Sequence, residues 1–100
     1  MPRVLVPLAQ GCEELEAVTI IDLLRRAQIE VTVAGLQSGP VTGSRGTVMV
    51  PDVNLDDAIN GDYDMVVLPG GQPGATHLEN DARVMQLVKS MAARRKIVAA

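Results

Sequence analysis

The sequence predicts an α/β fold in which helices cover both faces of a mostly parallel, doubly wound sheet. Two short runs rich in valine and leucine, residues 3–8 and 65–68, lack polar alternation, as expected of strands buried on both faces. Helical patterns follow them at residues 13–28 and 80–94, and each leads into another strand-like run. Strands that alternate with helices of this length favour right-handed crossovers and parallel pairing.

The first half of the chain reads as strand, helix, strand and loop. Within residues 13–28, apolar side chains recur at i, i+3, i+4 and i+7 from Ala17, which predicts an amphipathic helix. Acids in its first turn and arginines in its last oppose the helix macrodipole. Residues 29–34 alternate and are β-branched, which indicates a strand. Residues 35–46 contain four glycines and are predicted to be a loop.

The second half adds shorter elements. Residues 47–50 form a short predicted strand that a proline stops. Residues 54–59 fit a single helical turn with Asn54 as its N-cap. The helical pattern of residues 80–94 has the same spacing as that of the first helix, and residues 96–100 open another apolar strand.

Composition restricts the possible functions. The 100 residues suffice for one domain, and Tyr63 is the only aromatic residue, so the core must be aliphatic. A net charge of −3 without a basic stripe gives no support for nucleic-acid binding. No apolar run approaches the roughly 18 residues of a membrane span. One cysteine and one histidine make neither an internal disulfide nor a zinc site. We therefore expect a cytoplasmic protein with no metal and no cofactor.

The last residues of the chain raise a separate expectation. Residues 96–100 are an apolar, strand-like run without a turn, a cap or a polar tail. A domain rarely leaves a central strand as its terminus. We expect residues 1–100 to be the N-terminal part of a single domain, interrupted after Ala100, with a companion C-terminal fragment completing the fold.

Ligands of open α/β sheets bind beyond the carboxyl ends of the strands. Residues 10–16 and 69–74 should reach that edge, together with whatever follows Ala100. Gly70 and Gly71 have two interpretations: a tight turn, or a turn whose N–H groups stabilise an oxyanion. No Gly-Lys-Ser/Thr follows them, so the segment is not a phosphate loop.

The acids of the first helical turn differ in position. Glu13 and Glu14 are expected to be solvated and to compensate the helix dipole. Glu16 lies one position before the apolar face, so its carboxyl is a candidate for pointing inward over the strand ends. Burial there would raise its pKa and let it share a proton with a nucleophile.

The roles of several other residues are open to more than one interpretation. Cys12 is either an incidental small residue or a thiol activated by the helix N-terminus. His77 is expected on the surface, in a loop. Arg45 is either solvated or in reach of an anion or a partner subunit. Three apolar residues lie off the main face of the first helix and suggest an oligomer interface: Leu15, Val18 and Leu23.

Six segments match one known family in order and with similar spacing. They are residues 11–18, 21–26, 31–35, 44–46, 63–71 and 96–100. The pairing of G-x-E-E-x-E with a distant L-P-G-G is specific. The chain resembles the ThiJ/PfpI family, in particular its YajL-like branch, which is related to the parkinsonism-associated protein deglycase.

The resemblance implies a flavodoxin-like three-layer fold and a homodimer formed through the first helix. It also implies that Glu16 hydrogen-bonds a nucleophilic cysteine and that the backbone N–H of Gly71 helps to form the oxyanion hole. Gly70, Arg26 and Arg45 would lie near the substrate pocket or the dimer contact.

The nucleophile itself is implied just after Ala100, in a strand-to-helix elbow. Cys12 does not occupy that position. The family's downstream histidine is likewise absent from these residues, so this fragment alone is not expected to be an enzyme.

The activity implied for the completed protein is that of a cofactor-free, cysteine-dependent glyoxalase or protein deglycase. Its substrates would be methylglyoxal-like aldehydes or their adducts. The alternative is a redox-responsive chaperone or oxidative-stress sensor without substantial turnover, because an acid beside an exposed thiol also suits reversible oxidation. A peptidase or amidase, as in other branches of the family, is a third and less favoured interpretation.

Overall fold

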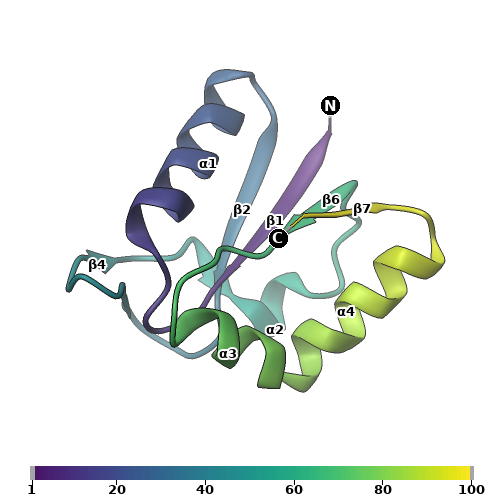
Figure 1. Ribbon diagram of the computed structural model, residues 1–100. Helices are drawn as coiled ribbons and strands as arrows, with labels where there is room; N and C mark the ends of the chain where they lie inside the picture. The colour runs from purple at the N-terminus through teal and green to yellow at the C-terminus, as the bar shows by residue number, and fades with distance from the viewer. Residues whose placement is uncertain (1, 100) are drawn as a thin grey trace.

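The main sheet has five strands in the order β5–β2–β1–β6–β7, and every pair in it is parallel (Figure 1). The computed structural model describes residues 2–99. The strands of this sheet are β1 (Arg3–Leu8), β2 (Glu30–Gly35), β5 (Val53–Asn54), β6 (Met65–Val67) and β7 (Ile97–Ala99). The first helix, α1, spans Glu14–Arg26. The predicted doubly wound parallel sheet is thereby confirmed.

Strand β1 is the centre of the sheet. It pairs with β2 in a register that runs from Arg3–Glu30 to Leu8–Gly35, and with β6 on its other side. The chain therefore leaves β1 toward β2 and β5 and later returns across β1 to β6 and β7. The strand order changes direction between β1 and β6, which is where doubly wound folds bind ligands.

Helices cover both faces of the sheet. Figure 1 shows α1 on one side and α2 (Leu55–Ala58), α3 (Gly74–Asn80) and α4 (Ala82–Ala93) on the other. Alternate residues of β1 point to the two faces, so Val4 and Val6 pack with Ala17 of α1 while Leu5 packs with Met91 of α4. Complete burial of a valine, leucine or methionine side chain stabilises the fold by about 1.5–3 kcal/mol.

The segment between β2 and β5 differs from the prediction. Residues 35–46 were expected to be a loop, but β3 (Val41–Thr42) pairs antiparallel with β4 (Val48–Met49) in a separate two-stranded sheet. The short strand predicted at residues 47–50 is confirmed by β4, whereas β3 was missed because a strand of two residues is too short to show a hydrophobic period. Asn54 does precede α2, but its side chain makes no capping hydrogen bond.

The predicted helix at residues 80–94 begins later than expected, and another helix precedes it. Asp81 caps α4 by accepting hydrogen bonds from the N–H groups of Arg83 (2.9 Å) and Val84 (3.3 Å). Residues 74–80 form α3, which the glycine- and proline-rich sequence before it concealed. His77 therefore lies in a helix, and the loop expected there was wrong. No helix within residues 2–99 is long and apolar enough to cross a membrane.

Candidate functional site

Three loops meet around the start of α1, at the carboxyl edge of the sheet. The loop after β1 receives a hydrogen bond from the loop after β6, since Gly74 N–H donates to Gly11 O at 3.2 Å. Glu13 N–H donates in turn to Gly70 O at 3.0 Å. The turn between β3 and β4 joins them through Ser44 N–H, which donates to Cys12 O at 2.8 Å. Backbone hydrogen bonds therefore join the three loops at the edge of the sheet that was predicted to carry the site.

Glu16 faces the loop after β6. Its Oε1 accepts a hydrogen bond from the backbone N–H of Gly70 at 2.9 Å, across 54 positions of sequence. Helix α1 starts where it does because Glu13 caps it, accepting from Leu15 N–H at 3.1 Å. That start places Glu16 next to the inward-facing Ala17, as the sequence pattern suggested. The bond occupies the Gly70 N–H, so Gly70 orients Glu16 and does not offer this donor to a substrate.

Gly71 packs against the backbone of Glu13 at the start of α1. Its φ of +90° is a conformation that side chains disfavour, and a Cβ built on it would lie 2.7 Å from Glu13 N. Its N–H donates to no group among residues 2–99. An unpaired backbone N–H thus directly follows the residue that binds Glu16, and a donor of this kind can stabilise negative charge on a substrate oxygen.

Glu14 is buried, which contradicts the expectation that it is solvated. Only 8% of the residue is exposed. Its carboxylate accepts hydrogen bonds from Arg45 N–H (2.9 Å), Thr47 N–H (3.0 Å) and Ser44 Oγ–H (3.3 Å). Hydrogen bonds from the backbone, that of Thr47 first, lower the pKa of Glu14 to about 2. The sequence carried no signal for this, because the donors lie 30 to 33 positions away.

Cys12 is buried, and its side chain packs in the cluster beneath α1. Burial raises the pKa of the thiol, and the negative charge of Glu14 raises it further. A helix N-terminus acts in the opposite direction, but the thiolate is disfavoured here. The interpretation of Cys12 as an incidental packing residue fits this environment.

The two candidate arginines lie apart. Arg45 contributes its backbone N–H to Glu14, while its side chain is exposed. Arg26 sits in the last turn of α1 and pairs with Asp22 (Nε–Oδ2 3.0 Å). Ten residues of helix separate Arg26 from Glu16, or about 15 Å. The structure does not bring Arg26 to the edge that carries Glu16 and Gly70.

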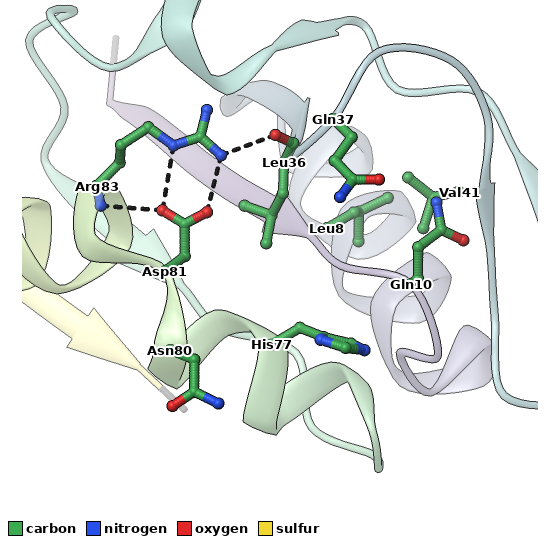
Figure 2. A pocket seen from close by; sticks show the side chains of 9 residues that line it. All are labelled: Leu8, Gln10, Leu36, Gln37, Val41, His77, Asn80, Asp81 and Arg83. Atoms are coloured by element: carbon green, nitrogen blue, oxygen red, sulfur yellow. Dashed lines mark hydrogen bonds and ion pairs between the residues drawn. The ribbon is translucent and has the colours of Figure 1, made fainter.

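A pocket that the sequence did not indicate lies beside this edge, on the side of α3 and α4 (Figure 2). Its volume is about 290 Å³. The pocket includes neither Glu16 nor Gly70, and Figure 2 shows Gln37 and His77 on opposite sides of it. Its lining residues are Leu8, Gln10, Leu36, Gln37, Val41, His77, Asn80, Asp81 and Arg83.

Two polar side chains hold the walls of this pocket. Gln10 bridges the hairpin, donating to Pro40 O (3.1 Å) and accepting from Thr42 N–H (2.8 Å). Arg83 pairs with Asp81 (2.7 Å) and donates to Leu36 O (2.7 Å). Within residues 2–99, no group of three or more His, Cys, Asp or Glu side chains is placed to hold a metal ion.

Comparison with known proteins gives one family. The model of the DJ-1/PfpI family matches residues 2–100. The Parkinson disease protein 7 homolog of Danio rerio is 46% identical over 100 residues, which cover 98% of this chain and 53% of that protein. The glutathione-independent glyoxalase DJR-1.2 of Caenorhabditis elegans is 35% identical over 81% of this chain and 43% of that protein.

The solved structures agree with these relatives. Oxidized DJ-1 of Toxoplasma gondii superposes with a TM-score of 0.95 at 39% identity, covering 98% of this chain and 54% of that one. The matched half of the Toxoplasma protein therefore has the same arrangement of sheet and helices as this chain. The chain spans about half the length of the relatives it matches.

Proposed function

Because the chain belongs to the DJ-1/PfpI family, we propose that it supplies half of the active centre of a cofactor-free, cysteine-dependent glyoxalase or deglycase. The substrates would be methylglyoxal-like aldehydes or their adducts. Cys12 is buried and the pKa of its thiol is raised, so we propose that the nucleophilic thiol lies outside these 100 residues. A relative described as a glutathione-independent glyoxalase supports this class of reaction.

One observation carries the proposal: at the carboxyl edge the Glu16 carboxylate binds the N–H of Gly70, and the N–H of the next residue, Gly71, donates to no group among residues 2–99. Gly70 N–H occupies Oε1 of Glu16 and leaves Oε2 for a thiol or a substrate proton. Thiol addition to an aldehyde is assisted by a carboxylate that exchanges protons and by an N–H donor that stabilises the developing oxyanion, which are the roles proposed for Glu16 and Gly71.

The reaction balances with the external thiol, the aldehyde and water, assisted by Glu16 and Gly71. The thiolate adds to the aldehyde carbon, and the carbonyl oxygen becomes an alkoxide beside the Gly71 N–H and then takes a proton. Glu16 removes the hydrogen from that carbon as a proton while the ketone oxygen is protonated, which gives an enediol. The proton is then returned to the neighbouring carbon as the first hydroxyl loses its proton, so the first carbon becomes a thioester carbonyl and the former ketone an alcohol. Water hydrolyses the resulting thioester to lactate and the free thiol. The internal redox change needs no external oxidant.

The test is the consumption of methylglyoxal by the completed protein, which includes the nucleophilic thiol, and by its Glu16→Gln variant, which keeps the size of the side chain but cannot accept the proton. We expect kcat to fall by about a hundredfold or more. Glu79→Gln is the matched control, because Glu79 is an exposed acid on α3. A folded Glu16→Gln variant that turns over at the wild-type rate would remove Glu16 from the mechanism.

A second candidate is a redox-responsive chaperone or stress sensor. Its support is that the matching Toxoplasma structure is described as oxidized. Peroxide would convert the thiol to sulfenic or sulfinic acid, and the Gly71 N–H would stabilise the charged product. This function is favoured if peroxide switches on the suppression of client aggregation while aldehyde turnover stays negligible.

A further inference from the structure

The two acids of the first turn of α1 leave the helix on nearly opposite sides. Residues two positions apart are separated by roughly 200° around a helix of 3.6 residues per turn. Glu14 accordingly binds the turn between β3 and β4, and Glu16 binds the loop after β6. The first turn is therefore held from both sides by loops that are distant in sequence.

Glu14 is bound closely by the turn between β3 and β4. Its carboxylate accepts hydrogen bonds from three residues of the hairpin turn: Ser44, Arg45 and Thr47. Gly43 packs directly beneath the side chain, so closely that a Cβ on Gly43 would overlap Cγ and Cδ of Glu14. The hairpin turn is thus built around this one carboxylate, and Glu14 can neither rotate nor be displaced without moving the turn.

The first turn of a helix is also the part most easily displaced, because its N–H groups lack helical partners. Glu16 lies in this turn, two residues after Glu14. We propose that Glu14 is a positioning residue: by anchoring the first turn of α1 to the hairpin, it fixes the direction in which the Glu16 carboxylate points at Gly70. The hairpin thereby becomes part of the support of the candidate active centre.

An electrostatic role is the competing explanation, because Glu14 is close in sequence to Glu13 and Glu16, and Arg45 and Cys12 face it from the loops. Two substitutions separate position from charge. Glu14→Gln removes the charge and presents an amide N–H₂ to backbone donors. Gly43→Ala keeps the charge but forces the carboxylate out of its place. The positioning role requires that both variants disturb Glu16, whereas a charge effect requires only the first.

The readout is the backbone amide of Gly70, which donates directly to Glu16. We expect its NMR resonance to shift and its hydrogen-exchange protection to fall in both Glu14→Gln and Gly43→Ala. Glu79→Gln removes an equal charge elsewhere and should leave it unchanged. If Gly70 is unaffected in both variants, or affected only by Glu14→Gln, the positioning role is refuted. Should both variants unfold, Ser44→Ala removes a single donor and should shift Gly70 in the same direction by less.

The consequence for catalysis rests on the function proposed above. In a folded Glu14→Gln variant, kcat for methylglyoxal should fall by about tenfold or more with KM little changed, since small displacements of a reacting group are costly. The two ideas can fail separately. If the completed wild-type protein shows no turnover but its Gly70 amide still responds to Glu14→Gln, the activity alone is refuted. Normal turnover in Glu14→Gln with an unmoved Gly70 would refute the positioning role alone.

Discussion

The diglycine turn after β6 allows a sharp test of the site's geometry, because its two glycines face different obstacles. A Cβ on Gly71 would lie 2.7 Å from the backbone nitrogen of Glu13 and 2.8 Å from its Cβ, and the φ of +90° is unfavourable for any side chain. A Cβ on Gly70 would lie 3.2 Å from Oε2 of Glu16, at the end of a flexible side chain. Gly71→Ala should therefore be the far more destabilising of the two.

The magnitude follows from two contributions. A left-handed backbone costs an alanine about 1–2 kcal/mol relative to glycine. Overpacking against rigid neighbours adds about 1–3 kcal/mol, because the backbone of Glu13 starts a capped helix and cannot move aside cheaply. Gly71→Ala should lower the free energy of unfolding by about 2–5 kcal/mol. Gly70→Ala should cost about 1 kcal/mol or less, because only a side-chain tip has to move.

Gly46 separates the two contributions experimentally. Its φ is +91°, almost that of Gly71, but a Cβ there would meet nothing within 4 Å. Gly46→Ala therefore reports the cost of the backbone conformation alone. Urea denaturation of the purified protein and the three alanine variants measures each change. The reasoning is wrong if Gly71→Ala is no more destabilising than Gly46→Ala, since the contact with Glu13 would then have no cost.

Two further predictions concern acid and assembly. The pKa of Glu14, about 2 in the fold against 4.5 normally, means that its contribution to stability is complete above about pH 4.5 and is lost as the pH falls toward 2. Urea midpoints measured downward from about pH 6 should fall less steeply in Glu14→Gln, and parallel curves would contradict this. The homodimer that we propose through α1 would bury Leu15, Val18 and Leu23, which are 76%, 48% and 59% exposed. Leu15→Glu should then yield monomers in analytical ultracentrifugation, whereas an exposed charge reversal such as Glu79→Lys should not.

Much of the sheet was predictable because the signals for its strands and helices are local. The run at residues 3–8 is β1 to the residue, and the spacing from Ala17 identified the buried side of α1. Strand β4 was predicted, but β3 escaped prediction because it has only two residues and is stabilised by pairing with β4 and by Gln10. Helix α3 escaped because its first residues pack against Cys12, a contact invisible in a Gly-Gln-Pro-Gly segment.

The candidate site, too, was predictable only where the signal is local in sequence. The position of Glu16 before an apolar face predicted an inward carboxyl, and the structure provides Gly70 as its partner. The sequence alone could not show whether the N–H of Gly70 would bind Glu16, as it does in the structure, or a substrate. The pocket with His77 and Arg83 was also unforeseen, because its walls come from three stretches that are distant in sequence, residues 8–10, 36–41 and 77–83.

The order of strands and helices, the aliphatic core and the approach of Glu16 to the strand ends were determined by the sequence itself, through periodicity and composition. Which acid of the first turn becomes buried and ionised was decided only by tertiary structure. Glu13, Glu14 and Glu16 share one local environment in the sequence, but the N–H groups that bind Glu14 lie 31 and 33 positions later. A carboxylate can be buried only where donors replace its water, and those donors exist only once the hairpin has folded over the helix.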